Sequence, residues 1–374
     1  MARVARNAEY TKEYNRKLIL RLLRSQPMSR AEIARQTGLT RACTSLIAAE
    51  LLNEGLVYEL EPVTGKHGRM PTPLALCGAA GYAVGVYLNR DGCTAGVVDM
   101  AGKVYAQQRI RIENEDQKVT AIVQAIREMS EQTGLPTEKF CGIGISAPGP
   151  LDGESGRILN PPRFDLWQQT DIGPALTEGT GLPVFLENNA TCLASYHNGR
   201  PESRGSSQFL LLLVDSGVGS GVISKGKVLK GAGYFTSELG HTSIDYRGRR
   251  CECGNVGCLE CYAAIPNLLQ GSGFRTWRQL IDALPDSEEA EELLRQEAEY
   301  LSTGVVNLTN LVPIDSVLLA GDLLYGAEQI APRMEALINA RILRGHVSVL
   351  PSAQTPDIKL LSAADVAFSR SLMV

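Results

Sequence analysis

The start of the chain has hydrophobic residues at the three- and four-residue spacing of an amphipathic helix. Within residues 14–26, Leu18, Ile19, Leu22 and Leu23 fall on one helical face, and most of the other residues of this segment are polar or charged. The proline that follows cannot continue a helix. The pattern therefore predicts one amphipathic helix that ends at about residue 26.

Two shorter helices are predicted after this proline. Ser29 and Glu32 have the spacing of a capping box and start the first helix, and Gly38 marks the turn that follows. Thr40 then caps the second helix. Two short helices joined by a turn with glycine are the signature of a helix-turn-helix, although any three-helix unit would share part of this pattern.

The second of these helices is the expected recognition helix. We expect Arg41, Thr44 and Ser45 to be exposed near its N-terminus, where such a helix presents side chains to base edges. The residues expected to face inward are Leu46, Ile47 and Leu51.

The next segment, residues 57–77, predicts a wing. It has two short strand-like ends around a glycine-rich basic tip with Lys66, His67 and Arg69. Such a hairpin would contact the DNA backbone or minor groove, and each lysine or arginine that neutralises a phosphate makes binding weaken with salt.

From about residue 78 the pattern changes to short apolar runs separated by glycines, with predicted strands at GYAVGVYLN, CTAGVVDM, KVYAQQRIRI and CGIGISAPG. One helix is predicted near 116–133 between the last two strands. A second series starts at 207–233, where GVISKGKV weakly repeats the GVVDMAGKV of 96–104. A helical segment at 286–312, a strand SVLLAGD and a helix at 327–343 follow. Two α/β lobes of this kind usually bind a ligand in the cleft between them.

Charge separates the start of the chain from the rest. Residues 1–75 carry 12 Lys and Arg against 7 Asp and Glu, and the other 299 residues carry 25 against 34. A basic head on an acidic body suggests that the head alone meets a polyanion such as DNA.

Neither a membrane helix nor a signal peptide is apparent. The longest apolar run, FLLLLV at 209–214, is too short to cross a membrane, and the first residues have no apolar core. We therefore expect a cytoplasmic protein, in which nine cysteines are not a disulfide framework.

The cysteines cluster in CECGNVGCLE at 251–260. Cys251, Cys253 and Cys258 offer thiolates on a glycine-rich loop, and zinc requires four ligands of this kind in a tetrahedron. The spacing leaves two candidates for the fourth ligand, His241 upstream and Cys261 downstream. It also leaves open a redox pair or no metal at all.

SELGHTSIDYRGRRCECGNVGCLE resembles the E-x-G-H and C-x-C-G-x-x-G-C-x-E signature of the ROK family of repressors and sugar kinases. GISAPGPLD at 144–152 is similar to the sugar-side loop of that family, ENNA at 187–190 to its E-N-D-A site, and GVGSG at 217–221 to its second phosphate loop. The resemblance spans the chain. It implies an α/β fold with an N-terminal winged helix-turn-helix at 1–77, followed by an actin-like body with lobes at 78–190 and 191–374, the C-terminal helix returning to the first lobe.

The resemblance also implies site residues. The zinc ligands would be His241, Cys251, Cys253 and Cys258, which leaves Cys261 outside the site. With four protein ligands the metal would be structural and have no open position for water. The sugar contacts implied are Gly149, Asn188, Asn189, Glu238, His241 and Glu260.

Three departures separate the chain from a kinase of this family. Asn189 stands where the kinases have the aspartate base, and an amide cannot accept a proton at neutral pH. The first phosphate loop reads GVYLNRDGCT, in which Tyr87 replaces an acidic residue and Asp91 is expected to repel phosphate. The adenosine-side glycine run has become LAGDLL.

The function expected is a sugar-responsive transcriptional repressor of carbohydrate-utilisation genes, not an enzyme. Its head would bind a roughly palindromic operator as a homodimer or a dimer of dimers. Xylose is one of several monosaccharides that the cleft would suit. The alternatives are an ATP-dependent hexose kinase with a regulatory head, and a repressor controlled by a protein partner.

Overall fold

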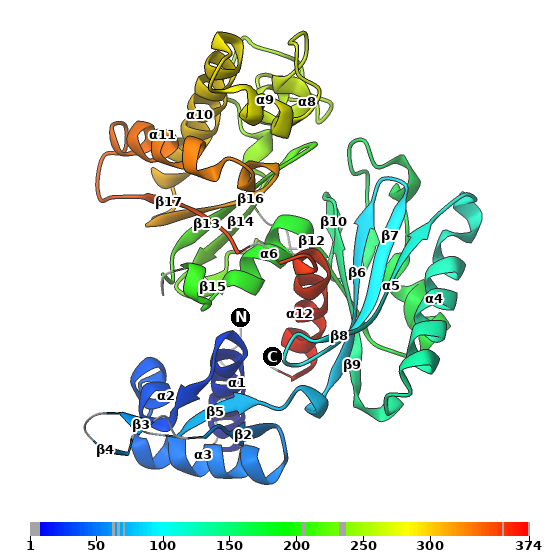
Figure 1. The fold of residues 1–374 in the computed structure, drawn as a ribbon. Coiled ribbons are helices and arrows are strands. Elements are labelled where there is room, and N and C mark those ends of the chain that lie inside the picture. The colour runs from blue at the N-terminus through cyan, green and yellow to red at the C-terminus, as the bar shows by residue number, and fades with distance from the viewer. Residues whose placement is uncertain are drawn as a thin grey trace.

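The computed structural model consists of a small N-terminal head and a body of two lobes (Figure 1). It describes residues 8–61, 64–65, 68–69, 72–203, 206–231, 237–353 and 355–372. No helix within these ranges combines the length and the apolar character needed to span a membrane.

The described part of the head has three helices, and the ends of the second and the start of the third agree with the predicted caps. Ser29 Oγ accepts the Glu32 N–H at 3.3 Å, and the Glu32 carboxylate accepts the Ser29 N–H at 2.8 Å. Gly38, with φ at +71°, ends this helix, and the Thr40 hydroxyl accepts the Cys43 N–H at 3.2 Å to start the next. The helices are α1 (Ala8–Ser25), α2 (Arg30–Thr37) and α3 (Arg41–Asn53).

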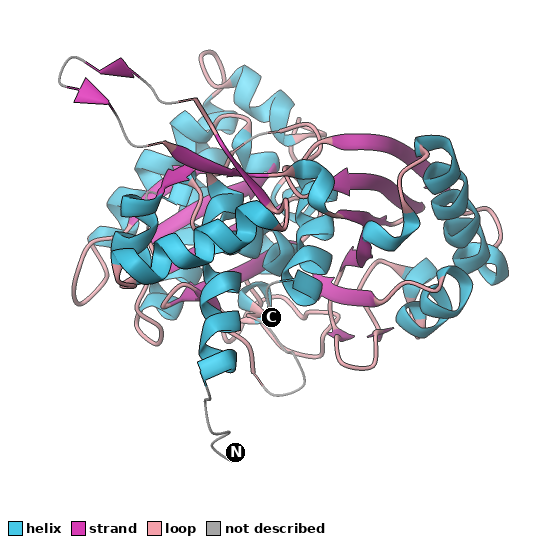
Figure 2. Cartoon of the chain, turned by 90° about the horizontal axis from the view of Figure 1, so that it is seen from below, coloured by secondary structure: helices cyan, strands magenta, loops and turns pink. Residues whose placement is uncertain are grey.

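The wing follows α3. Its strands β2 and β5 join β1, which precedes α2, in a sheet of order β1-β5-β2, and the short β3–β4 hairpin projects from the head (Figure 2). Arg69 ends β4, whereas Lys66 and His67 lie outside the described residues. The strands are β1 (Met28–Ser29), β2 (Val57–Glu59), β3 (Thr64–Gly65), β4 (Gly68–Arg69) and β5 (Pro73–Leu76).

Two details of the head differ from the sequence-based expectation. α1 begins at Ala8, six residues earlier than predicted. Thr44 is fully buried, and Leu46 is 62% exposed, so these two residues exchange the roles predicted for them. The buried face of α3 is Thr44, Ile47, Ala48 and Leu51, which has the i, i+3, i+4, i+7 spacing of one helical face. Because Thr44 is a polar residue type, the hydrophobic pattern alone did not identify this buried face.

The two lobes contain sheets of the same design. The orders are β12-β9-β6-β7-β8 and β15-β14-β13-β16-β17, and each has antiparallel pairs on one side of its first strand and parallel pairs on the other. The weak sequence repeat corresponds to equivalent turns, β7 to β8 and β14 to β15. The first-lobe strands are β6 (Tyr82–Asn89), β7 (Gly92–Asp99), β8 (Val104–Arg111), β9 (Phe140–Ala147) and β12 (Val184–Asn188). The second-lobe strands are β13 (Phe209–Val214), β14 (Val218–Ser224), β15 (Lys227–Val228), β16 (Ser316–Gly321) and β17 (Ser348–Pro351).

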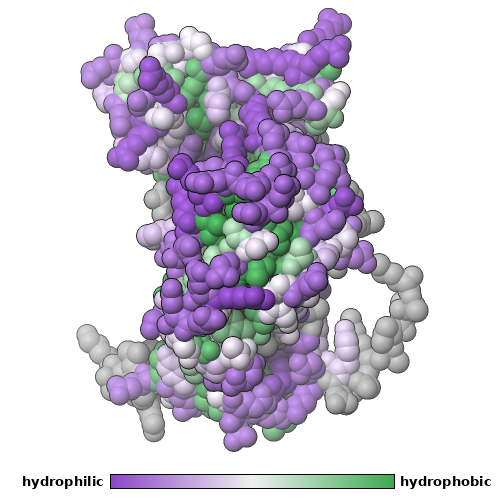
Figure 3. Space-filling model, turned by 90° about the vertical axis from the view of Figure 1, so that its right-hand side faces the viewer, coloured by the Kyte–Doolittle hydropathy of each residue, from purple (hydrophilic) through white to green (hydrophobic). Residues whose placement is uncertain are grey.

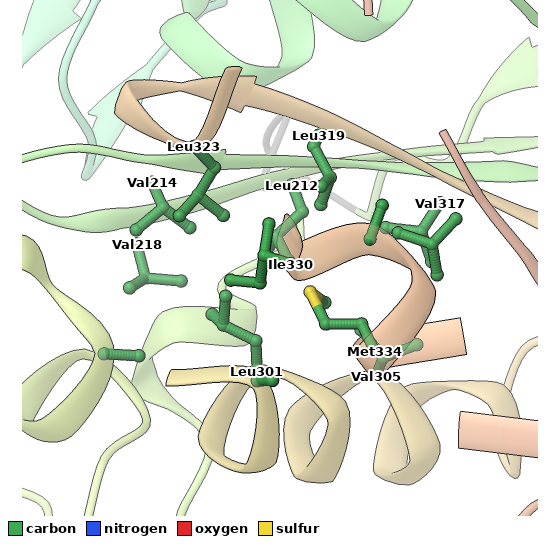
Figure 4. Close-up of a cluster of buried hydrophobic side chains, with 14 of the residues drawn as sticks. Leu212, Val214, Val218, Leu301, Val305, Val317, Leu319, Leu323, Ile330 and Met334 are labelled. Carbon is green, nitrogen blue, oxygen red and sulfur yellow. The ribbon is translucent and has the colours of Figure 1, made fainter. Parts of the chain in front are cut away.

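Helices cover both sheets. In the second lobe, side chains of α10 and α11 point at the sheet and form its core (Figure 4). The face seen from the first-lobe side is mostly hydrophilic, with a hydrophobic band across its middle (Figure 3). The helices of the body are α4 (Lys118–Thr133), α5 (Ile172–Thr180), α6 (Asn189–His197), α7 (Glu260–Ala263), α8 (Ile265–Leu268), α9 (Trp277–Ala283), α10 (Glu288–Thr309), α11 (Ala327–Asn339) and α12 (Ile358–Leu372). A small hairpin joins β10 (Leu151–Asp152) to β11 (Arg157–Ile158).

The last helix, α12, lies on the sheet of the first lobe, against β6 and β9, and also contacts α6. Its backbone comes so close that only glycine fits beneath it. A Cβ on Gly85 would lie 2.4 Å from the Leu360 carbonyl oxygen, and one on Gly144 would lie 1.9 Å from that of Ala363. α12 is therefore fixed to the first lobe.

The head and the body share one hydrophobic core through α12. Ile19 and Leu23 of α1 belong to the same buried cluster as Phe368 of α12. Beside this cluster, Arg24 Nε lies 2.5 Å from Asp365 Oδ1, with both side chains under a tenth exposed, and its guanidinium stacks 4.5 Å from the Phe368 ring centroid. α1 and α12 lie side by side (Figure 1).

Candidate functional site

A cavity of about 480 Å³ lies between the two lobes. All six residues expected to contact a sugar are among those that line it, although they come from four separate segments of the chain. These residues are Gly149, Asn188, Asn189, Glu238, His241 and Glu260.

The two asparagines are positioned by the junction of β12 and α6. Asn188 caps α6, because its Oδ1 accepts the Ala190 N–H at 3.0 Å. Its Nδ2 then lies beside Gly149, where an added Cβ would come within 3.0 Å of it. Asn189 Oδ1 accepts the Ser146 hydroxyl at 2.8 Å. The amide of Asn188 thus offers donors on the cavity side.

The two glutamates face the same cavity from the second lobe. Glu260 begins α7, and its Oε2 accepts the Val218 N–H at 2.9 Å. Burial raises the pKa of Glu238, the charge of Glu260 raises it further, and His241 lowers it. Carboxylate acceptors opposite an amide donor suit a ligand with several hydroxyl groups, each of which both donates and accepts.

Beside the cavity, His241 and three cysteines bring their ligand atoms within 4.8 Å of one another. His241 Nδ1 lies 3.6 Å from Cys251 Sγ, and the sulfurs of Cys253 and Cys258 are 3.7 Å apart. A zinc ion with tetrahedral sulfur and nitrogen ligands requires ligand atoms about 3.6–3.8 Å apart. The residues present therefore fit a four-coordinate ion.

Cys261, the other candidate left open by the spacing, is not in this group among the described residues. Its sulfur instead faces the Arg250 carbonyl oxygen at 3.8 Å. The turn Leu239–His241 brings the His241 ring to the cysteine loop. The same residue also contacts this loop through its backbone, because the His241 carbonyl oxygen accepts a hydrogen bond from Asn255 Nδ2 at 3.0 Å.

Other residues at the cavity were not found from the sequence. Lys359, in the first turn of α12, lies 4.8 Å from the centre of the Tyr87 ring, and both line the cavity. Arg163 Nη1 donates to the Ser216 carbonyl oxygen at 3.2 Å across the cleft. No motif marks Lys359 or Arg163, because each reaches the cavity through the packing of distant segments.

The phosphate side of the cleft differs from the expectation at Asp91. This carboxylate lies at the tip of the β6–β7 turn, pairs with Arg109 Nη2 at 3.2 Å, and is not among the cavity-lining residues. Any repulsion of a phosphate by Asp91 would therefore act from outside this cavity, and it stays a prediction. Asp215 and Asp322 line both this cavity and an adjoining one of about 870 Å³, and burial, with the charge of Asp215, raises the pKa of Asp322. The sequence analysis did not identify Asp215 as a residue that lines the cavity.

The candidate DNA-binding surface is the exposed face of α3. Arg41 and Ser45 are exposed there, as predicted, whereas Thr44 is not. Leu46, and the small residue Ala42, lie on the exposed side instead.

Comparisons with known proteins cover nearly the whole chain. The model of the ROK family matches residues 83–357. The xylose repressor of Bacillus subtilis (strain 168) is 25% identical over 374 residues, 97% of each chain. The DNA-binding transcriptional dual regulator NagC of Escherichia coli (strain K12) is 26% identical over 364 residues, 92% of this chain and 89% of that one.

Two solved structures have the same fold. A ROK family transcriptional regulator, a homologue of the E. coli MLC protein, has a TM-score of 0.76 and 22% identity over 97% of both chains. The ROK hexokinase of Thermus thermophilus has a TM-score of 0.66 and 27% identity, and covers 77% of this chain and 98% of its own. The expected two-lobed actin-like fold is thereby confirmed.

Proposed function

The chain belongs to the ROK family, and we propose that it is a sugar-responsive transcriptional repressor. One observation carries this proposal: a helix-turn-helix head is packed into the same hydrophobic core as a body whose cleft gathers all six expected sugar contacts. The full-length similarity to curated repressors supports it.

The head would bind operator DNA as a homodimer. Arg41 and Ser45 on the exposed face of α3 would contact the major groove, and Lys66 and Arg69 of the wing would contact the backbone. We assign the head to residues 1–77 and place the boundary between the lobes near residue 190, with α12 returning to the first lobe. Thr44 is assigned a structural role within the head.

The cleft would bind a monosaccharide. Glu238 and Glu260 would accept hydrogen bonds from its hydroxyl groups, and Asn188 would donate one, while Gly149 leaves room for the ring. His241, Cys251, Cys253 and Cys258 would hold a structural Zn²⁺ that fixes the loop between Glu238 and Glu260. Because His241 faces Cys251 through Nδ1, its Nε2 is free for the cavity side.

Phosphoryl transfer is disfavoured by three residues in the cleft. Asn189 has an amide where a base is required, and it already accepts a hydrogen bond from Ser146. Asp215 and Asp322 would repel the phosphates of a nucleotide. These features support a sensor over the alternative of a hexose kinase with a regulatory head.

α12 supplies a physical connection between the two sites. Lys359 at its N-terminal end lines the sugar cavity, and Asp365 and Phe368 farther along contact Arg24 of the head. A sugar that favours one closure of the lobes would therefore change the placement of the head, and sugar and DNA would each bias the same equilibrium.

The test is a panel of monosaccharides and sugar phosphates against the purified full chain, with thermal stability as readout. Operator duplexes selected from a random library are then titrated with and without the stabilising sugar. We expect one sugar class to raise the melting temperature and to change operator affinity. If no sugar does either, the sensor proposal fails, and steady ADP release with a hexose would establish the kinase instead.

A further inference from the structure

A separate cavity of about 410 Å³ lies at the joint between the head and the body. α1 of the head forms one wall, and the other walls come from the end of α6, the turn before β15, and α12. These elements converge around α1 (Figure 1). This joint cavity is distinct from the sugar cavity, with which it shares none of its lining residues.

The joint cavity contains a buried cation that is only partly satisfied. The Arg24 side chain is 8% exposed. Its Nε forms an ion pair with Asp365 Oδ1 at 2.5 Å, but within the described part of the chain neither Nε nor Nη1 has a hydrogen-bond partner. A buried guanidinium N–H without a partner costs free energy, because it has lost its hydrogen bonds to water.

Further cations surround Arg24. The other cationic residues that line the joint cavity are Lys17, Arg21, Arg200 and Lys227, and Asp365 is the acidic residue among the described lining residues. Lys17 Nζ also lies 3.9 Å from Glu13 Oε1. Burial lowers the pKa of Arg24, and the positive charge of Arg200 lowers it further, against the opposing effect of Asp365. The cavity therefore has an excess of positive charge that a bound anion would relieve.

We propose that the joint cavity binds a small phosphate-bearing anion, with Arg24 and Arg200 as its principal contacts. Guanidinium groups bind phosphate oxygens through paired hydrogen bonds, and an oxygen beside Arg24 Nη1 would supply its absent partner. The volume is enough for a phosphate with an organic part of sugar size. Tyr10 and Tyr14, each about half exposed, would lie along that part.

Such a ligand would bridge the head and the second lobe, because Lys17 belongs to α1 whereas Arg200 and Lys227 belong to the body. It would hold α1 in one position relative to the body. The site would thus report the level of a phosphorylated metabolite to the head, separately from the sugar in the cleft. The anion site itself does not depend on the proposed repressor function.

The experiment is calorimetric titration of the full chain with inorganic phosphate and with glucose 6-phosphate, in buffers matched for ionic strength with chloride. We expect saturable binding. Arg200→Gln and Lys227→Gln should each weaken it about tenfold, since each removes a contact to a charged oxygen. Both residues lie at the rim, so these variants avoid the folding risk of replacing Arg24.

Three matched variants give the controls. Lys225→Gln removes an exposed charge two residues from Lys227 that does not line the cavity, and it should leave binding unchanged. Arg41→Gln on α3 and Glu260→Gln in the sugar cavity should also leave phosphate binding unchanged. Absence of saturable binding, equal loss in Lys225→Gln and Lys227→Gln, or loss in Arg41→Gln would overturn the proposal. Failure of the sugar or operator assays would leave this readout intact.

Discussion

At the scale of a single residue, Glu260 links α7 to the glycine loop of the cleft. One oxygen accepts the Val218 N–H of the glycine loop, and the same oxygen would lie 2.9 Å from a Cβ on Gly217. Glu260 Oε2 is therefore held against the backbone of the glycine loop, which leaves Oε1 to accept a hydrogen bond from a ligand.

We predict that Glu260→Gln weakens sugar binding about tenfold or more, because a neutral amide accepts hydrogen bonds less strongly and loses one acceptor oxygen. Zinc content should stay at the wild-type value, since Glu260 is not a ligand. Calorimetry with the sugar identified by the panel measures the first effect, and metal analysis measures the second. Wild-type affinity in this variant would remove Glu260 from the sugar site.

Glu297 is a second informative residue, and it belongs to none of the proposed sites. It is fully buried in α10, and neither carboxylate oxygen has a hydrogen-bond partner among the described residues. Burial raises its pKa well above the ordinary 4.5. The folded protein thus keeps a proton that the unfolded chain releases as the pH rises above about 4.5.

Replacement of this buried acid by methionine should therefore stabilise the protein. Glu297→Met is expected to raise the free energy of unfolding by about 1–3 kcal/mol at pH 7, because it removes an unsatisfied polar group of similar size. The gain should shrink as the pH falls from 7 towards 4.5, where the unfolded chain also keeps its proton. Urea denaturation at pH 5 and pH 7 measures this. A loss of stability at both values would contradict it.

At the scale of elements, α3 illustrates what the sequence can and cannot specify. The caps at Ser29, Thr40 and Gly38 are local, and they were predicted correctly. The rotation of α3 depends on its packing partners, so Thr44 and Leu46 were each placed on the wrong side. Thr44 Oγ1 has no hydrogen-bond partner in the described ranges.

Thr44→Val should therefore leave operator affinity unchanged and raise the free energy of unfolding by about 1 kcal/mol, since valine has the same shape without the unsatisfied hydroxyl. Arg41→Ala is the matched variant on the exposed face. It should weaken operator binding by about 1–3 kcal/mol and relax sequence specificity, because it removes a contact to base edges in the major groove. Fluorescence anisotropy at several salt concentrations compares the two variants. Equal losses of affinity would restore Thr44 to the DNA-binding surface.

The metal-binding loop shows the same division between local and long-range information. The spacing alone identified the three cysteines as candidate ligands. The choice between His241 and Cys261 came from the family resemblance, and the proximity of the four side chains could be seen only in the folded structure. The strands of the first lobe were predicted well because each is a continuous apolar run bounded by turn residues. Asp215 was missed because its effect depends on Asp322, which is remote in sequence.

Cys253→Ser should lower both the zinc content and the melting temperature, because it removes one of the four residues that we propose as zinc ligands. Cys261→Ser should keep zinc and lose little stability. Metal analysis after dialysis against a chelator, followed by thermal melting, separates the two variants. Retention of zinc in Cys253→Ser with its loss in Cys261→Ser would reverse the ligand assignment.

At the scale of the whole molecule, the buried pair of Arg24 and Asp365 joins the head to α12. No sequence pattern relates two residues so far apart, and the docking of the head could not be predicted from the chain. Asp365 lies on the same helix as Lys359, which lines the cavity between the lobes. It is therefore placed to couple the two ends of the molecule.

Asp365→Asn should weaken the coupling between sugar binding in the cleft and operator binding by the head. Removal of one partner leaves the buried Arg24 charge uncompensated, so the free energy of unfolding is expected to fall by about 3–5 kcal/mol. Sugar binding should persist, because Asp365 does not line the sugar cavity, while the effect of sugar on operator affinity should become smaller. Calorimetry and anisotropy on the same preparation measure both. An unchanged sugar effect on DNA binding would show that coupling takes another route.

The position of α12 also matters while the protein is being made. During translation the head emerges from the ribosome before α12, and most domains fold in the order in which they emerge. Here the hydrophobic surface of α1 is completed by Phe368 of α12. A growing chain therefore already contains α3 before α12 is present to complete the hydrophobic core against α1. We expect a truncated product of interrupted translation to bind the operator more weakly than the full chain does.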